Sequence, residues 1–171
     1  MWIIIVGYVV GSILGGRLYG MWSGQHLATT GSGNTGARNA LRTGGKQAFL
    51  FVYGFDVLKT VLVLSISGPY FFETGLVLTL GHIYPIWHIR SGGKGYAVFS
   101  GIILAYSPLW FIGGLLLLLL LIKLTRNSRE TGLVMLVLLP LAAWGDATDV
   151  GLASLTMLLI VYHHIRGKQR A

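Results

Sequence analysis

A twelve-residue segment rich in glycine, amides and arginine, GSGNTGARNALR at residues 31–42, lies between two long apolar stretches. Its glycines allow a tight backbone whose amides converge on an anion. The sequence therefore makes this segment a candidate phosphate-binding loop. The candidate substrate-binding residues within it are Gly31, Gly33, Asn34, Gly36 and Asn39.

The second half of this segment is expected to form a short helix over residues 35–43, capped by Asn34 and ended by Gly44. Arg38 and Arg42 are four residues apart, so they share one face of that helix. Two like charges on one face repel each other unless an anion lies between them. A flexible linker with lipid-facing arginines is the alternative interpretation.

A second loop, SGGKG at residues 91–95, places glycines around Lys94. It lacks the spacing of a nucleotide P-loop, which needs four residues between its glycines and a serine or threonine after the lysine. Two loops that combine glycines with cations on the same membrane face predict one phosphate-rich pocket. The candidate phosphate-binding glycines are Gly92, Gly93 and Gly95.

Ionisable residues also occur within the apolar stretches. Asp56 and Lys59 are three apart and are expected to face the bundle interior and to pair. His82, near Lys94, is either a hydrogen-bonding core residue or a site residue. One of His163 and His164, at the end of the last apolar stretch, could reach the pocket as a hydrogen-bond donor. No carboxylates have metal-ligand or glycosidase spacing, so neither a metal nor another cofactor is predicted.

The composition indicates a protein embedded in lipid. Of its 171 residues, 54% are hydrophobic and only 11% are charged, well below the quarter that is typical of soluble domains. The net charge of +8 comes from bases scattered through short loops, which fits anionic lipid head groups and basic cytoplasmic loops rather than nucleic acid. The absence of cysteine excludes disulfides, thiolate metal sites and cysteine nucleophiles.

The apolar pattern predicts an all-α integral membrane protein, a single multi-pass domain over residues 1–171. The apolar stretches are residues 2–19, 48–70, 74–87, 96–122, 133–144 and 151–162. No basic residue precedes the first stretch, so we interpret it as a membrane helix rather than a signal peptide.

Pro108 divides the stretch 96–122. Two crossings there put every basic loop in the cytoplasm, whereas one crossing puts the basic loop after residue 122 and the basic tail outside and Asp146 with Asp149 inside. We therefore expect a compact bundle of about seven membrane helices, with the N-terminus outside and the C-terminus cytoplasmic. Residues 96–106 rise only about 16 Å against a hydrocarbon core of about 30 Å. Such short segments need protein or a wet cavity at their ends, which predicts a polar pocket on the cytoplasmic side.

Four segments, GSGNTGARNALR, FDVLKT, GHIYP and GGKG, occur in an order that resembles the bacterial membrane acyltransferases that use acyl phosphate to acylate glycerol 3-phosphate. The resemblance runs over residues 11–108 and includes Gly11-Ser12. It implies a cytoplasm-facing active site in the cell membrane that makes lysophosphatidic acid and releases phosphate, without a cofactor. It also implies that the catalytic residues are Ser32, Arg42, Lys94 and His163, with His82 in the substrate site.

The chain departs from the pattern of that family at several positions. Thr35 and Arg38 alter the first motif, and Ser91 replaces the first lysine of the second. Arg166 stands where the family has an asparagine, the family's serine after the third loop falls near Arg129, and the longer carboxyl tail is missing. These departures leave two alternatives open: a relative that acylates another phosphorylated acceptor, and a non-catalytic anion-binding or transport protein. The sequence predicts no nucleic-acid partner and does not fix the oligomeric state.

Overall fold

The computed structural model describes residues 1–89, 91–126, 131–132, 135–143 and 146–166. Helices are the regular structure of these residues, which confirms the all-α prediction. Their bounds are α1 (Trp2–Gly11), α2 (Gly15–Ser23), α3 (Ala37–Leu64), η1 (Gly68–Tyr70), α4 (Phe71–Ile83), α5 (Tyr96–Tyr106), α6 (Pro108–Thr125), η2 (Met135–Val137), α8 (Leu138–Ala142) and α9 (Ala147–Arg166).

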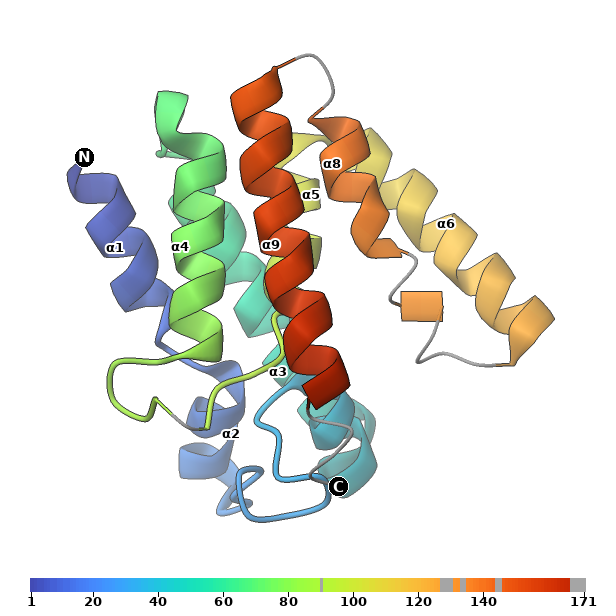
Figure 1. Ribbon diagram of the computed structural model, residues 1–171. Coiled ribbons are helices and arrows are strands. Elements are labelled where there is room, and N and C mark those ends of the chain that lie inside the picture. Colours follow the sequence, from blue (N-terminus) through green and yellow to red (C-terminus); the bar gives the residue numbers. More distant parts are fainter. Residues whose placement is uncertain (90, 127–130, 133–134, 144–145, 167–171) are drawn as a thin grey trace.

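The predicted break within residues 96–122 is present. Ser107 ends α5 in an extended conformation and also caps α6, where its hydroxyl accepts a hydrogen bond from the Trp110 amide at 3.5 Å. Pro108 is the first residue of α6, the helix position that tolerates proline because no amide is needed there. The chain reverses at this point, so α5 and α6 are separate helices (Figure 1).

Three helices of the described residues are long and apolar enough to cross a bilayer: Ala37–Leu64, Pro108–Thr125 and Ala147–Ile165. A fourth candidate is the pair formed by α1 and α2, bent by 41°. The first apolar stretch is therefore one bent pair rather than the single helix expected over residues 2–19. The count of seven membrane segments and their orientation remain predictions.

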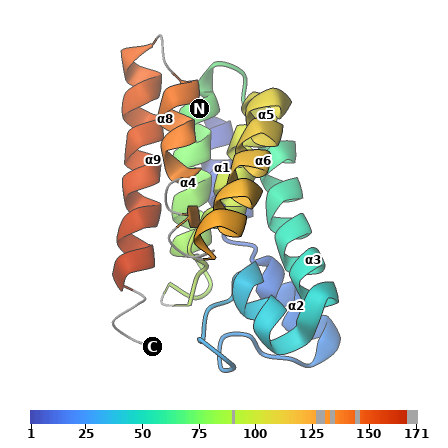
Figure 2. The same cartoon turned by 90° about the vertical axis from the view of Figure 1, so that its right-hand side faces the viewer.

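Close contact between helix backbones forms the centre of the bundle. The most extensive pairings join α1 with α4 and α3 with α5. A Cβ atom at Gly11 would overlap the backbone of Leu78, and one at Gly81 would overlap the carbonyl of Tyr8. Such pairs of small residues are typical of membrane helix interfaces. In contrast, α6 has no buried residue and slants away from the other helices (Figures 1 and 2).

Helix α3 is broken near its start. Gly45 has φ 75° and ψ −165°, a conformation that costs a glycine little and other residues considerably more. The short helix before the break spans the positions expected for the arginine helix, but it begins at Ala37 with Gly36 as its N-cap rather than Asn34. The break falls at Gly45, one residue after the expected stop at Gly44.

Both glycine loops reach the same end of the bundle. Figure 1 shows α2, residues 24–36, the start of α3, residues 84–89 and residues 91–95 gathered where α9 finishes, opposite the N-terminus of the chain. Helix α4 spans Phe71–Ile83, whereas the sequence pattern placed this element at residues 74–87. As a result, Tyr84 and Pro85 lie after α4, in the connection that leads to the second loop.

Candidate active site

One buried amide organises the first glycine loop. The side chain of Asn39 is 3% exposed. Its Nδ2 lies 3.0, 2.9 and 2.9 Å from the carbonyl oxygens of Leu27, Thr30 and Asn34. Its Oδ1 accepts a hydrogen bond from the Ser32 amide at 2.9 Å. Because both ends of this amide are occupied by backbone groups, Asn39 positions the loop rather than facing a substrate.

Several other residues of the first loop are exposed. Gly31 and Gly33 have positive φ angles of 59° and 69°. The Asn34 carboxamide accepts a hydrogen bond from the Gly36 amide at 3.1 Å, which closes a tight turn before α3. Ser32 on the loop and Arg42 on α3 are both exposed, as a substrate site requires.

The second glycine loop lies directly against the end of α4. The Gly93 amide donates to the His82 carbonyl oxygen at 3.0 Å. A Cβ atom at Gly93 would overlap the His82 ring, and one at Gly92 would overlap the carbonyl of Ile83. Glycine is therefore required here because the loop packs its backbone on α4. Lys94 follows and is half-buried, and Gly95, with φ 89°, is the N-cap of α5.

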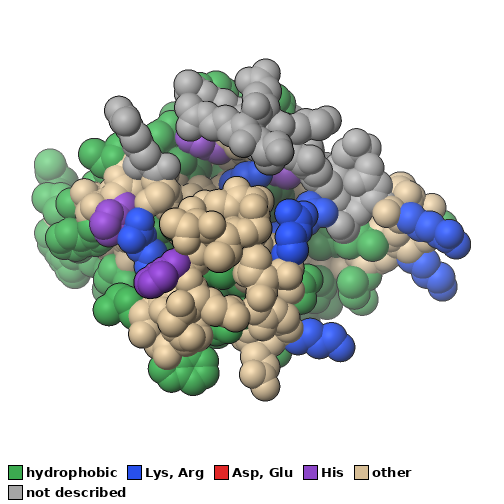
Figure 3. Space-filling view, turned by 90° about the horizontal axis from the view of Figure 1, so that it is seen from below, with side chains coloured by type: hydrophobic (Ala, Val, Ile, Leu, Met, Phe, Trp, Pro, Cys, Tyr) green, Lys and Arg blue, Asp and Glu red, His purple; other side chains and the backbone are tan. Residues whose placement is uncertain are grey.

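The two loops, more than fifty residues apart in the chain, are in contact. The Thr35 hydroxyl donates to the Ser91 carbonyl oxygen at 3.4 Å, and the Arg17 guanidinium donates to the Ser91 hydroxyl at 2.6 Å. The space-filling view of this end of the molecule shows arginine, lysine and histidine around the loops and no acidic side chain among the described residues (Figure 3). The structure thus confirms that both loops share one basic face.

A buried ionic cluster lies beneath the second loop. Lys59 Nζ is 2.8 Å from Asp56 Oδ1, which confirms the predicted pair. The same ammonium donates to the carbonyl oxygens of Gly11 at 3.1 Å and Ile13 at 2.6 Å. Asp56 Oδ1 in turn accepts from the Gly15 amide at 3.2 Å. Asp56 and Lys59, both on α3, thus provide hydrogen-bond partners for the backbone groups of Gly11, Ile13 and Gly15 at the break between α1 and α2.

His82 connects this cluster to the second loop. It is 3% exposed, and its Nδ1 lies 3.3 Å from Lys59 Nζ and 3.7 Å from Asp56 Oδ1. The opposite edge of its ring is covered by Gly93. These contacts agree with the interpretation of His82 as a hydrogen-bonding core residue. They also indicate that His82 positions the second loop relative to α4.

The two histidines near the end of α9 have different surroundings. His163 Nε2 lies 2.6 Å from the hydroxyl of Tyr84, the residue directly after α4. His164 is buried and its ring meets that of Tyr96 edge-on. His163 is thus the histidine attached to the candidate site. Arg166 ends α9, and its side chain lies outside the described part of the chain, as do Arg90, Arg129 and the tail.

Comparison with known proteins identifies the chain. Residues 1–171 match the family model of glycerol-3-phosphate acyltransferase. The glycerol-3-phosphate acyltransferase of Agrobacterium fabrum is 33% identical over 163 residues, which cover 92% of this chain and 80% of that protein. The chain belongs to the glycerol-3-phosphate acyltransferase family. A further relative with the same name, from Methylobacillus flagellatus, is 35% identical and covers 94% of this chain and 85% of its own length.

Two crystal structures share the fold of this acyltransferase. The glycerol 3-phosphate form of PlsY (YgiH), an integral membrane glycerol 3-phosphate acyltransferase, has a TM-score of 0.88 at 29% identity and covers 99% of this chain and 90% of its own. The lysophosphatidic acid form has a TM-score of 0.87 at 28% identity and covers 99% and 89%. The predicted family, enzyme class and membrane location are confirmed.

Sequence reasoning missed the residues that join the loops. Thr35 and Ser91 were noted only as departures, and Arg17 and Tyr84 were not among the candidates. Arg17 did carry a signal, because a cation in the apolar sequence GGRLYG is costly unless it serves a site. Among the described residues, no group of histidine and acidic side chains is arranged to hold a metal.

Proposed function

We propose that the two glycine loops form one active site, which transfers a fatty acyl group from acyl phosphate to glycerol 3-phosphate. The products are lysophosphatidic acid, which is the first intermediate of phospholipid synthesis, and phosphate, which is the by-product. The observation that carries this assignment is the contact between Thr35 and Ser91, which joins two phosphate-binding loops on a basic face.

The reaction needs positioning more than it needs a new reactive group. A hydroxyl of glycerol 3-phosphate attacks the acyl carbonyl carbon, a new ester C–O bond forms, and the C–O bond to phosphate breaks. Phosphate leaves with the electron pair and takes up the hydroxyl proton. Acyl phosphate is already an activated mixed anhydride, so holding two anionic substrates in line and stabilising developing charge supply most of the acceleration.

The proposed residue roles follow from exposure and charge. Arg42, which is exposed, and Lys94, which is half-buried, bind phosphate groups, because each is a cation of one of the two loops that share the basic face. Ser32 and the amides of Gly31 and Gly92 supply neutral donors to the phosphate oxygens, whereas the amides of Gly33 and Gly93 donate to the carbonyl oxygens of Thr30 and His82. His163, oriented by Tyr84, is placed to bond the acceptor from the end of α9. Asn39 and His82 are positioning residues.

The proposed location is the bacterial cell membrane, with this site facing the cytoplasm. The acidic residues Glu73, Asp146 and Asp149 begin α4 and α9 at the opposite end from the glycine loops. Basic loops favour the cytoplasmic side. The acyl chain of the donor would then lie among apolar helices while its phosphate reaches the loops.

The test is a product assay on purified protein in neutral detergent. Palmitoyl phosphate and palmitoyl coenzyme A are each offered with glycerol 3-phosphate, glycerol and other phosphorylated alcohols. We expect lysophosphatidic acid only from palmitoyl phosphate with glycerol 3-phosphate. Faster acylation of a different phosphorylated alcohol would make that alcohol the acceptor, and exclusive use of the coenzyme A ester would overturn the proposed donor.

A further inference from the structure

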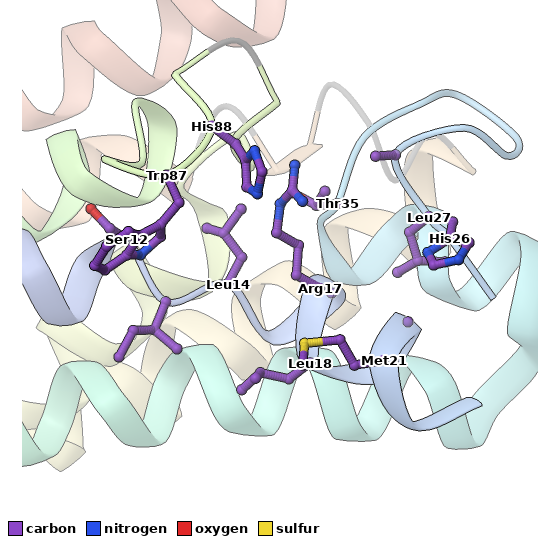
Figure 4. A pocket seen from close by; sticks show the side chains of 14 residues that line it. Ser12, Leu14, Arg17, Leu18, Met21, His26, Leu27, Thr35, Trp87 and His88 are labelled. Atoms are coloured by element: carbon purple, nitrogen blue, oxygen red, sulfur yellow. The ribbon is translucent and has the colours of Figure 1, made fainter. Parts of the chain in front are cut away.

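A cavity of about 360 Å³ lies beside the glycine loops, between α2 and residues 26–28 and 87–88. None of the site residues predicted from the sequence lines it, and Thr35 forms the wall that it shares with the first loop. Its volume falls within the range of small-molecule sites. The side chains around it, shown in Figure 4, include Arg17, His26, His88, Leu14, Leu18, Met21, Leu27 and Trp87.

Arg17 lines this cavity, and no acidic residue in the described part of the chain forms an ion pair with it. One of its N–H donors reaches the Ser91 hydroxyl at 2.6 Å, and its Nε is buried with no hydrogen-bond partner among the described residues. Among the described residues, Asp56 is the carboxylate that forms ion pairs, and its partners are Lys59 and His82 rather than Arg17. Leaving buried N–H donors of a charged group unpaired costs free energy that an anion recovers. A guanidinium with free donors is suited to phosphate in particular.

Two histidines add polar groups to the same cavity. Figure 4 shows the His88 ring next to the Arg17 guanidinium and the His26 ring on the far side of the cavity. Both side chains are otherwise exposed, so both are accessible to a ligand. An imidazole can donate a hydrogen bond to a phosphate oxygen in its neutral form. The cavity therefore has several donors and no described acid.

Most of the remaining lining is apolar, apart from Ser12 and Thr35. Leu18 and Met21 are three residues apart on one face of α2, and Leu14, the N-cap of that helix, also lines the cavity. Trp22 and Trp87 nearby are 77% and 61% exposed, as aromatic residues at the level of lipid head groups are. A single apolar strip beside a cation suits one hydrocarbon chain attached to one anionic head.

We propose that this cavity is a second phosphate site, which binds a single-chain amphiphile with a terminal phosphate group. Arg17 holds the phosphate, His88 donates to it, and the chain lies along the strip on α2. The proposed function supplies two molecules of this chemistry, the acyl phosphate donor and the lysophosphatidic acid product. The identity of the occupant rests on the proposed function, whereas the site itself does not.

The test is native mass spectrometry in a neutral detergent, titrated with hexadecyl phosphate, a stable compound of the proposed class. Arg17→Met is compared with wild type and with Lys123→Met, which removes an exposed cation from the end of α6, away from the cavity. We expect Arg17→Met to weaken one bound equivalent ten-fold or more and Lys123→Met to match wild type. Lys94→Ala should keep the equivalent that depends on Arg17, because Lys94 belongs to the other site.

Several outcomes would overturn the proposal. Equal binding by wild type and Arg17→Met would remove the site. An equal loss in Ser91→Ala would mean that Arg17 acts only through the second loop. Tighter binding of phosphatidylglycerol than of hexadecyl phosphate would exclude a single-chain ligand. Arg17→Lys, which keeps the charge, should retain part of the affinity, and this variant guards against a mere folding defect in Arg17→Met.

Steady-state kinetics then distinguish the acyl phosphate donor from the lysophosphatidic acid product as the occupant of the cavity. If the donor occupies the cavity, Arg17→Met raises the KM for palmitoyl phosphate and leaves the KM for glycerol 3-phosphate unchanged. If the product occupies it, the variant instead weakens inhibition by lysophosphatidic acid. Binding that depends on Arg17 in a protein without acyltransferase activity would support the site and reject the proposed function, so the two failures are separable.

Discussion

Lys94 and Arg42 come from loops that are distant in sequence and close in the fold, and the proposed mechanism depends on their charges. Arg42 is exposed and Lys94 is half-buried, so neither belongs to the buried core. Their removal should therefore affect the reaction more than the fold. Arg38, which is also exposed, is not required by the family pattern and serves as the neighbouring comparison.

We expect Arg42→Ala, Lys94→Ala and Ser32→Ala each to lower turnover ten-fold or more, which corresponds to about 1.4 kcal/mol of barrier. Arg38→Ala should have a smaller effect. Steady-state rates on purified variants measure this, with thermal unfolding as the check on folding. Full activity in all four variants would put the active site elsewhere.

The residues of the loops could be predicted from glycine and charge patterns, but their individual roles could not. Asn39 reads as a substrate-binding amide in sequence, and only the fold reveals that backbone carbonyls surround it. The same holds for His82, whose partner Lys59 is on a different helix. Spacing along one helix predicted the pair of Asp56 and Lys59, because residues three apart are neighbours.

At the scale of the elements, the buried pair of Asp56 and Lys59 holds the break between α1 and α2. The Lys59 ammonium contacts the Asp56 carboxylate and the backbone carbonyl oxygens of Gly11 and Ile13. Removing only the carboxylate charge leaves a buried cation, which typically costs about 3–5 kcal/mol. The break also forms one wall of the cavity around Arg17, so the pair supports both sites.

We therefore expect Asp56→Asn to lower the thermal unfolding temperature strongly, and Asp56→Asn with Lys59→Met to lose less than the sum of the two single variants. Differential scanning fluorimetry in detergent measures both. Glu73→Gln is the control, because Glu73 is only half-buried and makes no ion pair among the described residues. Additive losses would show that the two side chains act independently.

The second loop depends on its close approach to α4. A methyl group at Gly93 would overlap the His82 ring, whereas one at Gly54, on the exposed face of α3, meets nothing within 4 Å. Gly93→Ala should thus displace Lys94 and reduce activity ten-fold or more, while Gly54→Ala should retain it and slightly stabilise α3. Activity and unfolding temperature test the pair, and wild-type activity in Gly93→Ala would remove the positional role of the loop.

Helix positions could be anticipated from the sequence more closely than helix ends. Apolar runs located the long helices, and Pro108 located the reversal after α5. The bend between α1 and α2 could not be foreseen, because the carbonyls of Gly11 and Ile13 are satisfied by Lys59, far along the chain. The end of α4 at Ile83 has a similar cause, since the His82 carbonyl oxygen accepts a hydrogen bond from the Gly93 amide of the second loop.

At the scale of the whole molecule, charge is separated between the two ends of the bundle. The glycine loops and their cations lie at one end, and the described acidic residues other than Asp56 begin helices at the other. Basic loops are retained on the cytoplasmic side during insertion. This distribution supports an active site that faces the cytoplasm.

Single cysteines test the orientation, because the chain contains no cysteine of its own. Thr125, exposed at the end of α6, should react with an impermeant maleimide only when the cytoplasmic side is accessible. Thr148, exposed at the start of α9, should react from outside intact cells and serves as the matched control. The reverse pattern would contradict two separate crossings by α5 and α6.

The central claim is that substrates held by the two loops react directly with each other. The measurement that tests it is phosphate release during the first turnover, by rapid quench, with palmitoyl phosphate and without acceptor. Direct transfer predicts no burst, and phosphate appears only when glycerol 3-phosphate is added, in equal amount to lysophosphatidic acid. A burst equal to the enzyme concentration, with an acyl group added to the protein mass, would instead demonstrate a covalent intermediate and contradict the mechanism.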